Sequence, residues 1–260
     1  MKSKVRLVVA VIAAAMCPFV AKAQVDLGVK AGLSIPNLTS GNSSNPINSG
    51  WSSRLGLDAG LQAEFHLTKH FSIQPEVRYS SQGGKKDGTQ GFTPSPEMAQ
   101  YFQATGQPVP PYVYANYNNQ AKFNYLMVPV LAKYHFGFSP KWDLYVAAGP
   151  FVSFLLSGKN VTDGKSSVYY DEALSKPLQG FPEVDFNRTT DIKNDLKKAN
   201  WGISGQVGVA YHINSRSAVF IEGGGNYGFV KIQKDKVNGE NNTGAGVVVL
   251  GYSYRIKDKK

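Results

Sequence analysis

Apolar residues recur at every second position over long stretches of this chain. The alternation occupies eight segments: 25–35, 54–66, 71–80 and, less perfectly, 122–136, 142–156, 200–213, 218–230 and 244–256. A period of two is typical of β-strands, because successive side chains of a strand point to opposite faces of the sheet. Each segment is also long enough for a tilted strand that crosses a membrane, which needs about 9–11 residues. The chain is therefore predicted to be all-β, with eight strands.

The connections between these segments alternate in length. Three are tight turns: 67–70, 137–141 and 214–217. Four are long: 36–53, 82–121, 157–199 and 231–243. An antiparallel up-and-down transmembrane β-barrel in an outer membrane has this arrangement, with short turns in the periplasm and long loops outside. An even number of strands returns both termini to the periplasm.

The first 23 residues have the layout of an export signal. Three positive charges lie in 1–6, an apolar stretch follows in 7–20, and Ala21-Lys22-Ala23 offers small residues at a cleavage site. Such a segment is too short to span a membrane as a helix. Cleavage after Ala23 is predicted to leave 24–260 as a single barrel domain. Because the only cysteine is Cys17, the exported chain would have no disulfide and no thiolate metal site.

The charge balance does not indicate a nucleic-acid partner. The whole chain has a net charge of +10, but residues 1–23 hold four lysines and arginines and no acid, which leaves +6 on the remainder. The basic residues form no clustered run that could follow a phosphate backbone. The charged fraction is only 18%, which fits a barrel that shows charge on one face alone.

Alternation by itself does not say which face points outward, and a soluble lipocalin-like barrel would line a ligand cavity with its apolar face. Here the polar face carries charges in mid-strand, which suits the packed lumen of a narrow membrane barrel. The predicted lumenal network consists of Lys30, Arg54, Asp58, Glu64, Glu76, Arg78, Lys133, Glu222 and Arg255. Aromatics near the segment ends fit the girdles of a lipid-facing belt: Trp201, Tyr211, Tyr227, Phe229, Tyr252 and Tyr254.

Several strands resemble those of the PorT-like outer-membrane β-barrel family. The resemblance is carried by the range 25–34, by the proline-containing strand 125–134, by Ala148-Gly149-Pro150-Phe151 and by the ending 251–255. It covers essentially all of 24–260. The resemblance implies an eight-stranded barrel in a Gram-negative outer membrane. The first-named member of that family is tied to the export of proteins to the cell surface.

The candidate catalytic chemistry is sparse. His66, His135 and His212 lie on the polar face near the short-turn ends of their strands, and His70 opens the third strand. Their spacing is not that of a metal motif, so no metal and no cofactor are predicted. A lipid-modifying enzyme would need a histidine base near the outer rim, and the long loops contain none. The chain is therefore expected not to be an enzyme.

The predicted role is that of a monomeric, non-enzymatic barrel in outer-membrane lipid, with a structural or surface-binding function. The loops 82–121 and 157–199 are rich in Tyr, Asn, Ser and Gly, which suits a protein or glycan ligand. Two alternatives stay open: a narrow porin-like channel for small solutes, and an accessory component of protein export to the surface. Charges in so narrow a lumen are predicted to pair and plug it rather than to conduct.

Overall fold

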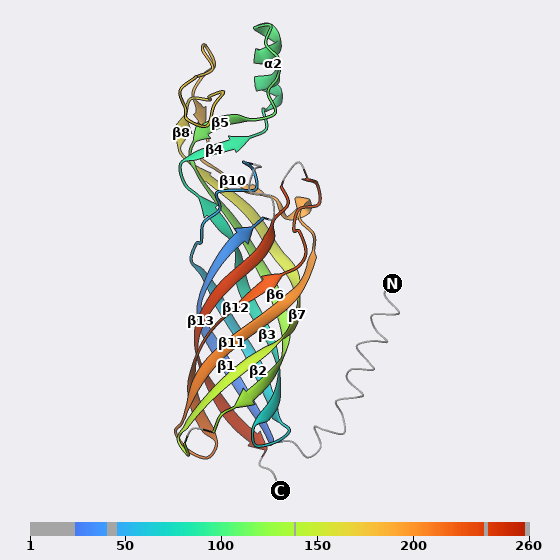
Figure 1. Cartoon of the computed structure of the whole chain (residues 1–260), viewed down its shortest axis with the longest axis vertical. Helices are drawn as coiled ribbons and strands as arrows, with labels where there is room; N and C mark the ends of the chain where they lie inside the picture. Colours follow the sequence, from blue (N-terminus) through green and yellow to red (C-terminus); the bar gives the residue numbers. More distant parts are fainter. Residues whose placement is uncertain (1–23, 41–45, 138, 237–238, 258–260) are drawn as a thin grey trace, which may run out of the picture.

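The computed structural model describes residues 24–40, 46–137, 139–236 and 239–257; the predicted signal segment 1–23 lies outside them. Eight long strands form the body of the molecule, and strands adjacent in the chain are adjacent in space (Figure 1). They are β1 (Gln24–Thr39), β2 (Gly56–His66), β3 (Phe71–Lys86), β6 (Asn118–His135), β7 (Trp142–Asp163), β11 (Ala199–His212), β12 (Ser217–Gly228) and β13 (Asn242–Lys257).

Antiparallel pairing runs through all eight strands and returns to the first. Val29 of β1 opposes Leu61 of β2 on one side and Tyr252 of β13 on the other. β7 likewise pairs with both β6 and β11. Each of the eight strands therefore has two barrel neighbours, and the sheet closes into a ring. The predicted eight-stranded up-and-down barrel is confirmed.

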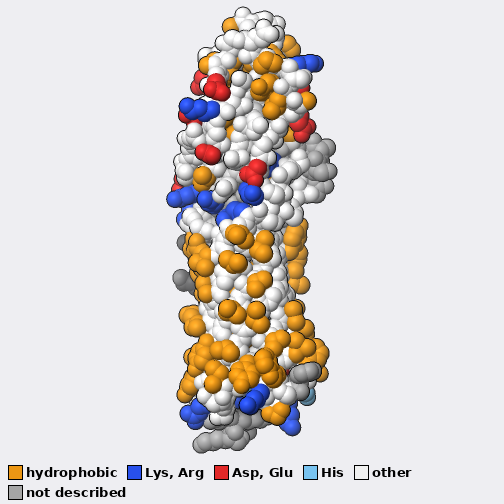
Figure 2. Space-filling model, turned by 90° about the vertical axis from the view of Figure 1, so that its left-hand side faces the viewer, with side chains coloured by type: hydrophobic (Ala, Val, Ile, Leu, Met, Phe, Trp, Pro, Cys, Tyr) orange, Lys and Arg blue, Asp and Glu red, His pale blue; other side chains and the backbone are white. Residues whose placement is uncertain are grey.

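The two faces of the strands differ as the alternation predicts. On β1, Leu27, Val29 and Leu33 point outward and are 46–52% exposed, whereas Lys30 and Ser34 point into the lumen and are at most 4% exposed. Figure 2 shows the outward apolar side chains as a belt around the lower half of the molecule, with charged groups above it. Aromatic pairs mark both ends of this apolar belt. Trp201 contacts Phe229 at the long-loop end, and Trp142 contacts Tyr211 at the short-turn end.

Three strands continue well beyond the apolar belt, which corrects the predicted loop boundaries. β3, β6 and β7 contain 16, 18 and 22 residues, against about 9–11 needed to cross hydrocarbon. The beginnings of both predicted loops are therefore strand: Gln82 opposes Phe123, and Asn118 opposes Asp163. At the long-loop end, these strand extensions lead up to the short elements of the loops (Figure 1).

The long connections hold short elements of their own. Between β3 and β6 lie β4 (Thr89–Phe92), α2 (Pro96–Ala104) and β5 (Val113–Asn116). Between β7 and β11 lie β8 (Lys165–Ser166), β9 (Val184–Asp185), β10 (Arg188–Asp191) and the 3-10 helix η1 (Lys193–Asp195). No helix in the described part of the chain is both long and apolar enough to cross a membrane.

Helix α2 is not among the predicted elements, although a local sequence signal for it exists. Ser95 caps the helix by accepting a hydrogen bond from the backbone N–H of Met98, and Pro96 occupies the first turn. A serine cap followed by proline is a common helix start. Proline in a strand removes a ladder donor and often marks a bulge, but the register is unchanged across Pro75 and Pro129; the irregularities lie at Val25/Asp26 and Asn124/Tyr125.

A charge placed in the apolar belt tests the orientation of the two faces. Leu61 lies in the middle of β2 and is 61% exposed. We expect Leu61→Arg to lower the free energy of unfolding in phospholipid vesicles by about 2–4 kcal/mol, because the guanidinium would lie near the centre of the hydrocarbon. Urea titration followed by tryptophan fluorescence measures this. The matched change Val109→Arg, in an exposed loop, should have little effect; an equal loss in both variants would contradict the assignment.

Candidate functional site in the lumen and at the barrel mouth

The middle of the lumen is built around one lysine shared by two carboxylates. Lys30 Nζ lies 2.7 Å from Glu76 Oε1 and 2.8 Å from Glu222 Oε2, and all three side chains are at most 1% exposed. Tyr145 donates a hydrogen bond of 2.9 Å to the other oxygen of Glu222. Strands β1, β3, β7 and β12 thus meet at one cluster in the barrel interior.

A second cation lies next to this cluster. Arg78 Nε donates to Asp58 Oδ1 at 3.0 Å, and its Nη1 lies 3.6 Å from Glu76 Oε2. The Arg78 side chain is 2% exposed and that of Asp58 is fully buried. The cavity beside Arg78 and Glu222 has a volume of only about 10 Å³, which is about the space of one water molecule. The side chains therefore fill the lumen at this level.

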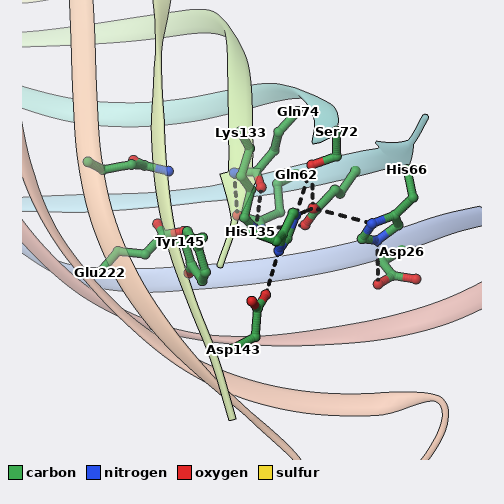
Figure 3. Close-up of polar contacts among 12 residues, drawn as sticks. Asp26, Gln62, His66, Ser72, Gln74, Lys133, His135, Asp143, Tyr145 and Glu222 are labelled. Carbon is green, nitrogen blue, oxygen red and sulfur yellow. Dashed lines mark hydrogen bonds and ion pairs between the residues drawn. The ribbon is translucent and has the colours of Figure 1, made fainter. Parts of the chain in front are cut away.

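A third cation lies nearer the short-turn end. Lys133 Nζ lies 2.7 Å from Glu64 Oε2, donates to Gln74 Oε1 at 3.1 Å, and lies 3.8 Å from the centroid of the Tyr145 ring. Figure 3 shows these side chains converging from several strands on the lumen. Buried charges are stable only when paired and hydrogen-bonded, and here each ammonium has a carboxylate at contact distance.

Two of the nine predicted network residues lie at the ends of the barrel and not in its middle. Arg54 precedes β2 and donates to Ser81 Oγ and to the carbonyl oxygens of Leu55 and Gln82, so it anchors chain segments at the long-loop end. Arg255 lies at the short-turn end and donates to both oxygens of Asp26, at 2.9 and 3.1 Å. The other seven, Lys30, Asp58, Glu64, Glu76, Arg78, Lys133 and Glu222, are buried in the lumen.

Several residues that contact the lumenal charges are not among the nine predicted network residues. Gln74, Tyr145 and His135 are buried and contact the lumenal charges, and the half-buried Asp143 contacts His135 at the short-turn end. Gln74 and His135 stand two positions from the predicted inward residues Glu76 and Lys133, whereas β7 held no predicted inward residue from which Tyr145 or Asp143 could be placed. Attention to charge alone missed the amide and the phenol that complete the hydrogen bonding.

A different kind of site lies at the mouth of the barrel, above the apolar belt. A cavity of about 360 Å³ opens there, and we name it the mouth cavity. All four long connections or their flanking strand ends contribute to its wall, which includes Trp51, Lys86, Gln90, Phe92, Tyr117, Asn119, Asn160, Leu196, Gln233 and Asn241. Aromatic and amide side chains thus line one space.

The mouth cavity contains polar atoms that the protein leaves without a hydrogen bond. Trp51 Nε1 and Asn119 Oδ1 are buried atoms with no partner among the described residues. Lys86 lies 4.9 Å from the centroid of the Trp51 ring and donates to the carbonyl oxygens of Pro46 and Ile47, each at 2.9 Å. Burial lowers the pKa of Lys86 to about 8. Unpaired buried donors and acceptors are costly, and seven other buried side-chain atoms of the described residues also have no hydrogen-bond partner, among them Asp58 Oδ2 and Tyr125 Oη.

The loops beside this cavity are folded on each other. Met98 and Phe102 of α2 pack with Val113, Val168 and Leu178, all buried, which joins the second long connection to the third. Tyr117 stacks on Phe186 with the ring centroids 4.1 Å apart and the planes 3° from parallel. This loop module, formed by 87–117 and 164–187, has apolar cores of its own and therefore presents a preformed surface.

Residues 20–234 match the family model described as "Outer membrane protein beta-barrel domain". No curated protein sequence matches the chain. Similar solved structures share little sequence with it. A major outer membrane protein from Thermus thermophilus is 12% identical, with a TM-score of 0.44, over 90% of this chain and 99% of that one. Neisserial surface protein A is 13% identical, with a TM-score of 0.40, over 88% of this chain and 97% of that one.

Removing one partner from the lumenal network tests its contribution to stability. Glu222→Ala would leave the Lys30 ammonium with one carboxylate and Tyr145 without its acceptor. We expect the free energy of unfolding to fall by about 3–5 kcal/mol, the usual cost of breaking a buried ion pair. The control is Lys231→Ala, which removes an exposed pair with Glu240 and should cost at most about 1 kcal/mol. Urea unfolding in detergent micelles measures both, and equal effects would contradict the network's role.

Proposed function

This chain belongs to the outer membrane protein β-barrel domain family, and from that premise we propose that it is a non-conducting, non-enzymatic barrel that binds a ligand at the cell surface. The barrel anchors the chain in the outer membrane, and the mouth cavity with the loop module forms the binding site. The observation that carries this proposal is the mouth cavity itself, which is lined by aromatic and amide side chains from all four long connections or their flanking strand ends.

The chemistry of the cavity favours a terminal sugar of a glycan. The rings of Trp51, Phe92 and Tyr117 offer flat apolar faces for the C–H groups of a pyranose, and the amides of Gln90, Asn119 and others offer partners for its hydroxyls. A volume of about 360 Å³ lies at the small end of the range for ligand pockets, about 300–1,000 Å³. It suits a sugar or a similar small polar molecule rather than a folded protein. Lys86 adds a cation for an acidic sugar.

We further propose that the short-turn end faces the periplasm, with both termini there, and that the long-loop end faces the medium. The support is the strict alternation of short and long connections, which is general among outer-membrane barrels. Export would remove residues 1–23. The lumenal ion pairs and the very small void between them support a closed pore and a monomer that needs no neighbour to complete its site.

The finer family assignment, to the PorT-like barrels, is a separate proposal that rests on the strand motifs at 25–34 and 125–134. It would give the chain an accessory role in export to the cell surface. Purification of the intact protein from its own membrane distinguishes the two roles. Secretion proteins in stoichiometric amounts would favour export, and a barrel that elutes alone would favour ligand binding.

Binding of glycans to the purified barrel tests the mouth cavity. We expect a panel of fluorescent glycans to include ligands of the protein in nanodiscs, and Trp51→Phe to weaken them by about 5–10-fold, because the ring stays while one buried hydrogen bond is lost. Asn119→Ala should have a similar effect. Trp201→Phe is the matched control, since Trp201 lies on the apolar belt. Binding that is unchanged in Trp51→Phe and Asn119→Ala would exclude this cavity as the site.

Single-channel recording in a planar bilayer tests the closed lumen. We expect the protein to insert without stable openings, because Lys30, Arg78 and their carboxylates occupy the cross-section. The recording should be repeated with Glu222→Ala, whose smaller side chain leaves room for water beside Lys30. Stable, ion-selective openings of the unaltered protein would favour the porin-like alternative over the proposal.

A further inference from the structure

The short-turn end of the lumen opens into a polar vestibule with a volume of about 270 Å³. Two histidines and a glutamate meet on its wall: Glu64 and His66 from β2, and His135 from β6 (Figure 3). Strand β3 lies between β2 and β6, and its Ser72 is paired with His66 on one side and with Lys133 on the other. The barrel register therefore brings His135 next to residues about 70 positions earlier in the chain.

The three side chains present one ligand atom each to a common point. His66 Nδ1 lies 3.8 Å and His135 Nε2 lies 2.7 Å from Glu64 Oε1. The three atoms lie within 4.8 Å of one another. For a tetrahedral metal with bonds of about 2.0–2.1 Å, ligand atoms are about 3.3 Å apart. The observed separations bracket that value, so small rotations of the side chains would complete the geometry.

The other ring nitrogen of each histidine is held by a carboxylate. His66 Nε2 donates to Asp26 Oδ2 at 3.0 Å, and His135 Nδ1 makes a short hydrogen bond to Asp143. Metal-binding histidines usually have such a carboxylate on the far nitrogen, because it fixes the tautomer and makes the coordinating nitrogen more basic. Here both histidines have that partner, and both coordinating nitrogens face Glu64.

The contact between His135 and Glu64 requires a positive charge. When His135 donates its Nδ1 proton to Asp143, the Nε2 lone pair faces Glu64 Oε1 at 2.7 Å. Two lone pairs at this distance repel, so a proton or a cation must lie between them. The Ser72 hydroxyl donates to the same Glu64 oxygen at 2.6 Å and also lies 3.1 Å from His135 Nε2, so it contacts both groups.

From this geometry we propose that Glu64, His66 and His135 form a binding site for a divalent zinc-class cation at the short-turn end of the barrel. Two imidazoles and one carboxylate suit zinc, and a fourth position would open into the vestibule for water or another ligand. The sequence expectation of no metal considered only spacing along the chain. Spacing along the chain does not predict this site, because two of its residues lie on β2 and the third is the last residue of β6.

The neighbouring charges leave the proposed ligand atoms available. Lys133 pairs with Glu64 through Oε2, which keeps Oε1 for the cation. Arg255 pairs with Asp26, outside the ligand set. With both histidines neutral, the three carboxylates of the vestibule wall (Asp26, Glu64 and Asp143) equal its three cations (Lys69, Lys133 and Arg255) in number, so the ligand atoms themselves, and not a net negative charge, would hold the cation. His212 also lines the vestibule, but it lies outside the ligand cluster.

The test uses untagged protein purified from membranes in detergent and freed of metal by chelator. We expect isothermal titration with Zn²⁺ to give one site per chain and the thermal unfolding midpoint to rise with zinc concentration. Cobalt should give the intense visible absorption of a four-coordinate ion. Mg²⁺ should produce neither effect, because imidazole is a poor ligand for it.

Variants assign the site to its residues. We expect His66→Gln to weaken zinc binding by more than about 100-fold, and Asp143→Asn by about 10–100-fold, which is the range for loss of a carboxylate behind a histidine ligand. His212→Gln, in the same vestibule, should bind zinc as the unaltered protein does. Heat-modifiable migration on a gel verifies that each variant is folded. The proposal is overturned if the unaltered protein shows no zinc-dependent change, if Mg²⁺ acts equally, or if His66→Gln and His212→Gln lose binding alike.

Discussion

The absence of water in a lipid bilayer is the constraint on which the whole structure depends. Every backbone N–H and C=O of a strand that crosses hydrocarbon must be paired within the protein, and for strands this requires a closed ring. The pairing of β1 with β13 satisfies that requirement by joining the first strand to the last. Closure at eight strands then fixes the second property of the molecule, because a ring of this size encloses only enough space for its own side chains.

The narrow lumen and the pairing of the charges buried in it depend on each other. Lys30, Arg78 and Lys133 point inward because the alternate positions on their strands face lipid, where a charge would cost more. In the narrow interior each contacts a carboxylate, and the same contacts that stabilise the charges fill the cross-section. The interior therefore joins the strands into one rigid body. The larger cavities lie toward the two ends, the mouth cavity at one and the vestibule at the other, and these are the places where we propose that outside molecules bind.

The alternation of inward and outward positions along each strand predicted the residues in the middle of the lumen better than those at either end of the barrel. Position along an alternating strand is enough to point Glu76 and Glu222 inward, and seven of the nine predicted residues are buried in the lumen; Arg255 lines its short-turn end. The alternation failed for Arg54, which lies before β2 begins and turns to Ser81 and Gln82. The alternation also does not predict which inward residues contact each other, because the contact between Lys30 and Glu222 joins residues 192 positions apart. That distance is bridged only when the ring closes.

The sequence by itself determined the strand number, the inward and outward faces, and the order of short and long connections. These follow from local periodicity, since a strand exposes alternate residues wherever it is placed. Only the tertiary structure decided how far β3, β6 and β7 rise above the belt, how α2 packs on the third long connection, and which side chains meet at Trp51 or at Glu64. Those features arise between segments that are remote in the chain, and their geometry depends on the register of the closed ring rather than on any local pattern.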